Sequence, residues 1–127
     1  MNGINNNLVL IHYSKSVVYP HSWYKVKEIL ENYECRFVSC NPDEYEHFPL
    51  KNLVTYQQLY SIEEMYQMIH GCRLFIGNQS SPLAMAMSLF KPCIALLTHE
   101  PWFYAKKYYP KLWWIGHSMT DLTDFNI

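Results

Sequence analysis

The residues with the most evident chemistry form a polar loop between an apolar run and a helix-forming run. The loop consists of Gly77, Asn78, Gln79, Ser80, Ser81 and Pro82. Pro82 suits the first helical turn, where its missing N–H costs nothing, and Ser80 or Ser81 can cap the helix. The free N–H groups and the dipole of such a helix attract anions, phosphates especially. A well-capped helix without a ligand has the same pattern, so both interpretations stay open.

Charged residues follow two other apolar runs. Ser14 and Lys15 follow the first run of the chain, and Asp43 and Glu44 follow the second. Lys15 could bind a phosphate or be an ordinary solvated lysine. The two carboxylates could accept hydrogen bonds from hydroxyl groups or simply favour a turn or a helix start.

The histidines and cysteines form no recognisable metal or catalytic motif. No His-x-x-x-His or Cys-x-x-Cys spacing occurs among His12, His21, His47, His70, His99, His117, Cys35, Cys40, Cys72 and Cys93. We expect no metal site and assign most of the histidines to surface or helix-end roles, with a structural role for His99 beside Glu100. Most of the cysteines are expected to be buried and reduced, which indicates a cytoplasmic protein.

Composition predicts one folded domain. The chain has 127 residues, half of them hydrophobic, and a formal net charge of -1. This charge argues against nucleic acid as a partner, and no apolar run is long enough for a transmembrane segment. No signal-peptide pattern is present. Residues 1–7 are expected to be a disordered lead, and residues 8–127 a single domain.

The pattern of apolar residues predicts alternating strands and helices. Strands are expected over 8–13, 35–40, 53–56, 73–76, 93–97 and 112–116. Helices are expected over 20–33, 61–70, 81–90 and 101–109, with a turn at 41–44 and a short helical piece in 45–50. A capping box, Ser61 with Glu64, opens the helix that Gly71 should end.

The buried faces of the helices follow from their spacing. We expect the buried positions to be Trp23, Val26, Ile29 and Leu30, then Ile62, Met65, Tyr66 and Ile69, then Leu83, Ala84, Met87 and Leu89.

Alternating strands and helices predict an α/β fold, a Rossmann-like three-layer sandwich. Its parallel sheet of about five to six strands would carry helices on both faces. Ligands of such sheets bind beyond the carboxyl ends of the strands, where the connectivity reverses. The segments that fall at strand carboxyl ends are 14–15, 43–44, 77–82 and 98–100. They are expected to share one rim.

This order of motifs resembles the carboxyl-terminal half of heptosyltransferase-like GT-B glycosyltransferases. In that family a helix, a strand, a Gly-Asn/Asp-x-Ser/Gly-x-Pro loop, a small-residue helix and a Lys-Pro-x-Ile-Ala-Leu strand follow one another. The matching segments are 61–65, 69–73, 75–82, 84–86 and 91–97, with a fainter likeness in 8–15, Trp23, 37–38 and 43–45.

The resemblance implies the lobe that binds a nucleoside-diphosphate sugar, which is a substrate rather than a cofactor. It implies that the diphosphate lies over Gly77–Pro82, with contacts from Ser14 and Lys15. It implies that Glu44, or else Asp43, binds ribose hydroxyls. Sugar transfer to a glycan or other acceptor would need no metal. The helix N-terminus and Lys15 would stabilise the leaving diphosphate.

Two features depart from the family pattern. Asn78 or Gln79 stands where heptosyltransferases often have an acidic residue, and an amide cannot carry that charge. The chain is also one lobe long, so an amino-terminal lobe or a partner subunit would have to supply the acceptor site and the general base. The alternative is a non-catalytic nucleotide-binding or protein-interaction module that retains the fold. A flavodoxin-like receiver or flavoprotein fits less well, because Tyr13-Ser14 replaces a receiver's acidic pair.

The carboxyl-terminal part is dense in aromatic residues, interleaved with Lys106, Lys107 and Lys111. The aromatic residues are Trp102, Phe103, Tyr104, Tyr108, Tyr109, Trp113 and Trp114. Such a segment could stack on nucleic acid, but the near-neutral charge argues against it. We expect an exposed apolar surface that meets a missing lobe or a partner subunit.

Overall fold

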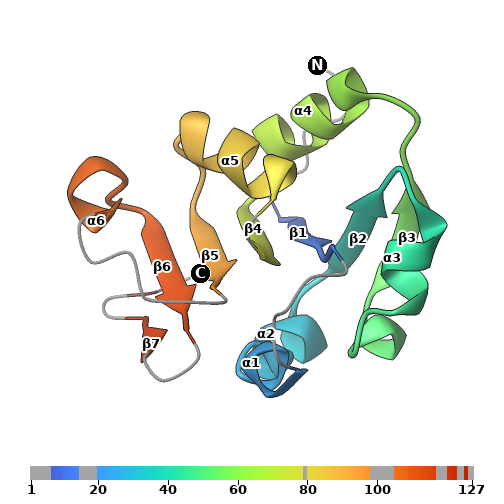
Figure 1. Ribbon diagram of the computed structural model, residues 1–127, viewed down its shortest axis with the longest axis horizontal. Helices are drawn as coiled ribbons and strands as arrows, with labels where there is room; N and C mark the ends of the chain where they lie inside the picture. Colours follow the sequence, from blue (N-terminus) through green and yellow to red (C-terminus); the bar gives the residue numbers. More distant parts are fainter. Residues whose placement is uncertain are drawn as a thin grey trace.

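A computed structural model describes residues 7–14, 20–78, 80–97, 105–116, 120–122 and 125 (Figure 1). The strands are β1 (Val9–His12), β2 (Cys35–Ser39), β3 (Thr55–Gln58), β4 (Leu74–Asn78), β5 (Cys93–Leu96), β6 (Leu112–Ile115) and β7 (Thr120–Asp121). The helices are α1 (Pro20–Tyr24), α2 (Lys27–Asn32), α3 (Pro42–Glu46), α4 (Ile62–Gly71), α5 (Ser81–Ser88) and α6 (Ala105–Tyr108), with a 3₁₀ turn over Lys51–Leu53.

The described strands form one seven-stranded sheet in the order β3-β2-β1-β4-β5-β6-β7. All neighbours are parallel except β6 and β7, which pair antiparallel. The strands β1, β2 and β3 follow one another toward one edge of the sheet. The chain then crosses to the other side of β1, where β4 to β7 follow one another toward the opposite edge. The predicted parallel α/β sheet is therefore confirmed, and its connectivity reverses between β1 and β4.

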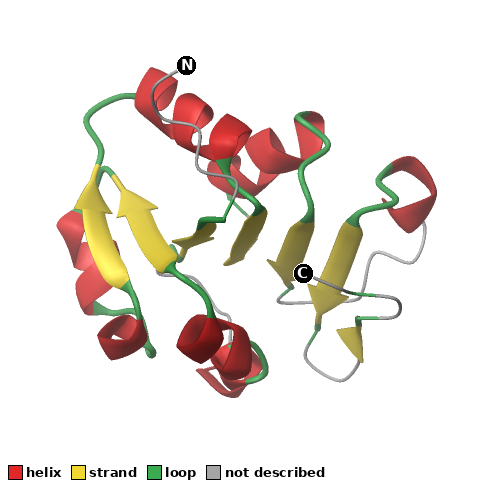
Figure 2. Cartoon of the chain, turned by 180° about the vertical axis from the view of Figure 1, so that it is seen from behind, coloured by secondary structure: helices red, strands yellow, loops and turns green. Residues whose placement is uncertain are grey.

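Helices cover both faces of this sheet (Figures 1 and 2). One buried cluster lies between the sheet and α1, α2 and the α3 region, with Trp23, Phe37 and Phe48 among its largest side chains. The other lies between the sheet and α4 and α5, with Phe75 and Leu83 at its centre. Buried runs such as Val9–His12 and Leu74–Asn78 are what a sheet covered on both faces requires.

The helix predicted over 20–33 is two helices. The chain turns at Lys25 and Val26, where the Val26 N–H donates to the Trp23 carbonyl at 3.0 Å, an i to i−3 bond. Val26 has ψ 5°, outside the helical range. The predicted apolar face is still buried, with Trp23, Val26 and Leu30 in one cluster. Apolar spacing therefore identified the face but missed the break, which depends on local backbone geometry.

The turn predicted at 41–44 is instead the start of α3. The Asn41 side chain accepts from the Asp43 N–H at 3.0 Å, and Pro42 begins the helix. Asn, Pro and Asp favour both turns and helix starts, so the local pattern did not separate the two. The third strand likewise lies two residues later than the expected 53–56.

The predicted side-chain cap is confirmed for α4, and the predicted buried faces of α4 and α5 are confirmed only in part. The Ser61 hydroxyl accepts from the Glu64 N–H at 3.1 Å, as the capping box predicts. Met65 and Ile69 are buried, but Ile62 and Tyr66 are exposed. Ala84 is exposed too, and Ala86 takes the buried position in α5. These helices bury a narrower stripe than the spacing predicted.

Three of the four cysteines are buried and all four are unpaired. Burial raises the pKa of Cys35 to about 12, of Cys72 to about 11 and of Cys93 to about 12. Such thiols stay protonated near neutral pH. The predicted burial is confirmed for these three cysteines, whereas Cys40 is exposed. No helix among the described residues is both long and apolar enough to cross a bilayer.

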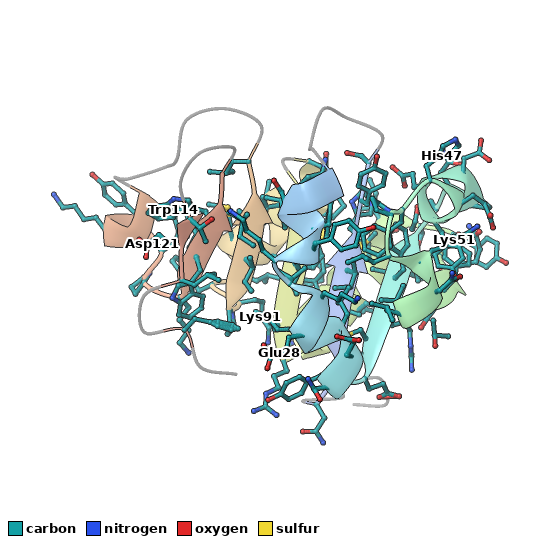
Figure 3. The ribbon with its side chains drawn as sticks, turned by 90° about the horizontal axis from the view of Figure 1, so that it is seen from below. Glu28, His47, Lys51, Lys91, Trp114 and Asp121 are labelled. Atoms are coloured by element: carbon teal, nitrogen blue, oxygen red, sulfur yellow. The ribbon has the colours of Figure 1, made fainter. Side chains whose placement is uncertain are left out.

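In the aromatic carboxyl-terminal part, Trp113 and Trp114 belong to the core rather than to the surface. Trp113 and Trp114 lie in β6 and are buried on opposite faces of the sheet. Figure 3 shows Trp114 close to Asp121 on β7, its partner in the sheet register. The predicted exposed surface is therefore wrong for these two residues, while Tyr108 is exposed. Residues 101–104 lie outside the described residues.

An apolar hollow opens at the amino ends of β5 and β6. Its volume is about 190 Å³ and it is lined by Met87, Phe90, Lys91, Cys93, Tyr109, Pro110, Lys111 and Leu112. Phe90 ends α5 in a Schellman motif, because its N–H donates to the Met87 carbonyl and the Lys91 N–H donates to the Ala86 carbonyl. Its φ of 55° is a value that glycine adopts more readily, and its ring is 64 % exposed beside Tyr109.

Candidate functional site

The candidate site lies where the carboxyl ends of β1 and β4 meet. Residue His12 of β1 pairs with Gly77 of β4. A Cβ on Gly77 would lie 2.8 Å from the Phe75 ring atom Cε1 and 3.2 Å from the His12 carbonyl oxygen. Gly77 is therefore a strand residue needed for close packing, whereas the sequence placed it in a tight turn.

Asn78 joins the two strand ends. Its side chain accepts from the Ser14 N–H at 3.0 Å and donates to the Ser14 hydroxyl at 3.0 Å and to the Ser14 carbonyl at 3.3 Å. Asn78 is fully buried. Two predicted site residues, 64 positions apart, are thus brought together, because the side-chain amide of Asn78 hydrogen-bonds to Ser14. An acidic side chain here could not donate to the Ser14 carbonyl, which explains the amide.

The loop after Asn78 opens α5. Ser80 occupies the cap position with an extended backbone, but its hydroxyl makes no capping bond. It donates instead to the Asn78 carbonyl at 3.2 Å. Ser81 is exposed and Pro82 half-buried in the first helical turn. The first-turn N–H groups of α5 therefore receive no cap from Ser80, unlike those of α4, which Ser61 caps.

Glu44 comes to the same rim from β2 and α3. The cap and Pro42 start α3 directly after β2, which places Glu44 in the first helical turn. Its Oε1 atom accepts a hydrogen bond from the Ser39 hydroxyl and lies 3.3 Å from His12 Nε2. Burial opposes ionisation of this carboxyl, but the hydrogen bonds from His12 and Ser39 and the charge of His12 prevail and lower its pKa. Asp43 is exposed at the start of α3.

His12 is the site residue that sequence reasoning missed, because most of the six histidines were assigned to surface or helix-end roles. It is 5 % exposed at the end of β1. Its Nδ1 atom is buried and has no hydrogen-bond partner among the described residues. The signal that could have found it is position, because His12 ends an apolar strand at the rim where ligands of such sheets bind.

The remaining predicted rim residues fall outside the described residues. These are Lys15, Gln79 and the segment 98–100 with His99 and Glu100. Within the described part of the chain, no group of three or more histidine, cysteine or acidic side chains could hold a metal ion.

Comparison with known proteins supports the fold. No protein-family model matches the chain, and no curated protein matches it either. The structure is similar to the E. coli heptosyltransferase WaaC with ADP, with a TM-score of 0.65 and 13 % identity over 99 % of this chain and 42 % of that one. It is also similar to WaaC with ADP-2-deoxy-2-fluoro heptose, with a TM-score of 0.59 and 16 % identity over 80 % of this chain and 36 % of that one.

The chain spans about two fifths of the length of these heptosyltransferase structures. The coverage fits one lobe of a two-lobed glycosyltransferase, the size that the sequence resemblance implied. At these identities the likeness concerns the fold. The chain therefore has the Rossmann-like fold found in part of a GT-B heptosyltransferase, as its loop and strand motifs predicted.

Proposed function

We propose that this chain is the lobe that binds a nucleoside-diphosphate sugar in a heptosyltransferase-like GT-B glycosyltransferase. The enzyme would transfer the sugar to a glycan or other acceptor. WaaC, whose fold the chain shares, has been captured with ADP and with an ADP-heptose analogue. The acceptor site and the general base would come from another lobe or a partner subunit, so this lobe alone is expected to be inactive.

The observation that carries the proposal is the open start of α5 at the reversal point of the sheet. Ser80 bonds to Asn78 and leaves the first-turn N–H groups without its cap. Such groups, together with the helix dipole, favour a phosphate. Buried Asn78 holds Ser14 beside this helix start. The diphosphate would therefore lie over Ser80 and Ser81, with Ser14 on its other side.

Glu44 would bind the ribose from the neighbouring strand end. Its carboxyl is ionised and only 20 % of its side chain is exposed. A carboxylate oxygen in that position can accept hydrogen bonds from a vicinal diol. Lys15 is assigned to the phosphates from the sequence alone. No metal is needed, because the helix N-terminus and Lys15 supply the charge that stabilises the leaving diphosphate.

A titration of the full chain followed by protein-observed NMR tests the proposal. ADP, UDP, GDP and CMP are added first, then their sugar conjugates. Saturable shifts centred on Gly77, Ser81 and Ser14 are expected, and the base with the lowest Kd names the donor. No shifts from any nucleotide, on a folded sample, would refute the proposal and favour the protein-interaction module.

A pair of matched variants separates charge at the site from general effects. Ser80→Asp is expected to cap α5 and stabilise the fold while it repels phosphate, with affinity for the preferred nucleotide falling at least about tenfold. Ser61→Asp makes the same change at the cap of α4 and should leave affinity unchanged. Equal affinity in the wild type and the Ser80→Asp variant would place the phosphates elsewhere.

A further inference from the structure

The arrangement around His12 is not explained by folding alone. A buried ring nitrogen without a partner costs about 1–3 kcal/mol of desolvation, and His12 Nδ1 has none among the described residues. The other ring nitrogen faces the Glu44 carboxylate. A purely apolar residue at the end of β1 would avoid the cost, so the ring must supply something that an apolar side chain cannot.

We propose that His12 is a positioning residue that orients Glu44 toward the vicinal diol of a ribose. The inference rests on the proposed function. It adds the group that lets Glu44 distinguish ribose from deoxyribose. His12 and Ser39 both contact the same carboxylate oxygen, Oε1. Neither contact uses Oε2, and no described residue hydrogen-bonds that atom. One oxygen of Glu44 is held, and the other is left for a ligand.

Three elements determine the orientation of this carboxylate. Ser39, fully buried at the end of β2, accepts from the Asn41 N–H at 2.9 Å and so has its own hydroxyl directed. Asn41 in turn caps α3, which carries Glu44. His12 approaches from β1, next to β2 in the sheet. The carboxylate is thereby held from two strands, which limits rotation about its terminal bond and reduces the entropy lost when a diol binds.

The carboxylate also determines which nitrogen of His12 carries the proton. An imidazole nitrogen that hydrogen-bonds to a carboxylate carries a proton, here on Nε2. Nδ1 has no hydrogen-bond partner among the described residues, so no contact there favours the other tautomer. This tautomer is a property of the free protein and can be measured without a ligand.

The consequence for binding is discrimination between ribose and deoxyribose. A charge-assisted hydrogen bond from the 2′-hydroxyl to Oε2 would favour ADP over 2′-deoxy-ADP by about tenfold or more. If a neutral apolar group replaced His12, the carboxylate would be free to turn, and this preference would fall. Affinity for the diphosphate part, measured with pyrophosphate, would not change, because His12 has no role at α5.

The experiment compares the wild type with His12→Leu and His12→Gln. Gln places an amide N–H near the position of Nε2 and is expected to retain the preference for ADP, whereas Leu is expected to lose it with pyrophosphate binding intact. Dispersed amide spectra establish that each variant is folded. Ring ¹⁵N NMR of His12 in the wild type should show a proton on Nε2, and Glu44→Gln should remove the preference for that nitrogen.

The outcomes distinguish the two proposals. If ADP binds with a ribose preference that a folded His12→Leu variant keeps, the positioning role is wrong and the donor lobe stands. An Nε2 atom without a proton in the wild type overturns the positioning role whether or not His12→Leu folds. If the wild type binds no nucleotide and no pyrophosphate, the proposed function fails first, and the role of His12 fails with it.

Discussion

The carboxyl ends of β1 and β4 and the amino ends of β5 and β6 are built from opposite kinds of side chain. The buried polar side chains at the first are His12 and Asn78, and Ser39 lies at the neighbouring carboxyl end of β2. At the second, the apolar hollow is partly open and is lined largely by apolar side chains, with Phe90 exposed at its edge. Both regions belong to one sheet, and both core clusters extend toward them.

The difference lies in what each region requires of its residues. Buried polar groups need specific partners at specific distances, since one missing partner leaves an unsatisfied group. Apolar contacts are less specific, so residues of similar volume replace one another at little cost. The polar rim should therefore tolerate substitution poorly, and the hollow should tolerate it well. At the carboxyl end, the unpartnered Nδ1 atom of His12 costs free energy of folding, as expected of a site.

The largest effect is expected from Asn78→Leu. The variant leaves the Ser14 N–H and carbonyl without their partner, and should lower the free energy of unfolding by about 2–4 kcal/mol. Met87→Leu, a substitution of similar volume at the hollow, should cost less than about 1.5 kcal/mol. Denaturant unfolding of both variants measures the contrast. If the two variants lose similar free energies of unfolding, the polar rim and the apolar hollow do not differ in their tolerance of substitution.

Gly77→Ala should cost about 1–3 kcal/mol, because the new methyl group would crowd Phe75 and the His12 carbonyl. A double-mutant cycle separates the contact with the Phe75 ring from the contact with the His12 carbonyl. In a Phe75→Leu background the ring atom at 2.8 Å is gone, so the same substitution should cost less. Equal costs in both backgrounds would assign the strain to the His12 carbonyl alone.

Phe90 offers a test of backbone strain at the hollow. Phe90→Ala removes the ring and keeps the unfavourable φ, whereas Phe90→Gly removes the ring and relieves it. The glycine variant should therefore be more stable than the alanine variant by about 1 kcal/mol. Thermal unfolding of the pair is sufficient. If the alanine variant is as stable as the glycine variant, the left-handed conformation carries no cost here.

The smallest effect concerns acid stability. The pKa of Glu44 lies below its ordinary value of 4.5, so the folded state gains stability above that value and loses it as the pH falls through the lowered pKa. The free energy of unfolding should therefore fall more in acid for the wild type than for Glu44→Gln. Tyr56 and His12 face Glu44, and both are retained in the variant. If the free energies of unfolding of the wild type and of Glu44→Gln change in parallel with pH, the partners of Glu44 do not lower its pKa in the folded state.

Local patterns predicted most of the elements. Apolar runs located β1, β2, β4, β5 and β6, because a sheet covered on both faces needs continuous burial. The half-exposed strand β3 lies two residues later than predicted. Cap residues located α4 and α5 to within about one or two residues at their amino ends. The strand β7 was missed, since two residues carry too little pattern. The break between α1 and α2 was missed because Val26 is compatible with a helix by composition.

For the candidate site, sequence alone determined the loop chemistry and the rim to which it belongs. Alternating elements imply a parallel sheet, and a parallel sheet brings strand carboxyl ends to one edge. Gly77, Ser80, Ser81, Ser14 and Glu44 could therefore be assigned to the rim before any coordinates. The resemblance to heptosyltransferases rested on the same segments, and the fold agrees with it.

Only the tertiary structure decided which of these residues meet. Asn78 turns inward to Ser14, and Glu44 pairs with His12 and Ser39, because strand order and register bring together segments far apart in the sequence. Trp113 and Trp114 are core for the same reason, since β6 lies between β5 and β7. Side-chain periodicity describes one element at a time. The partners of a buried polar group depend on neighbouring elements, and that information exists only once the sheet has formed.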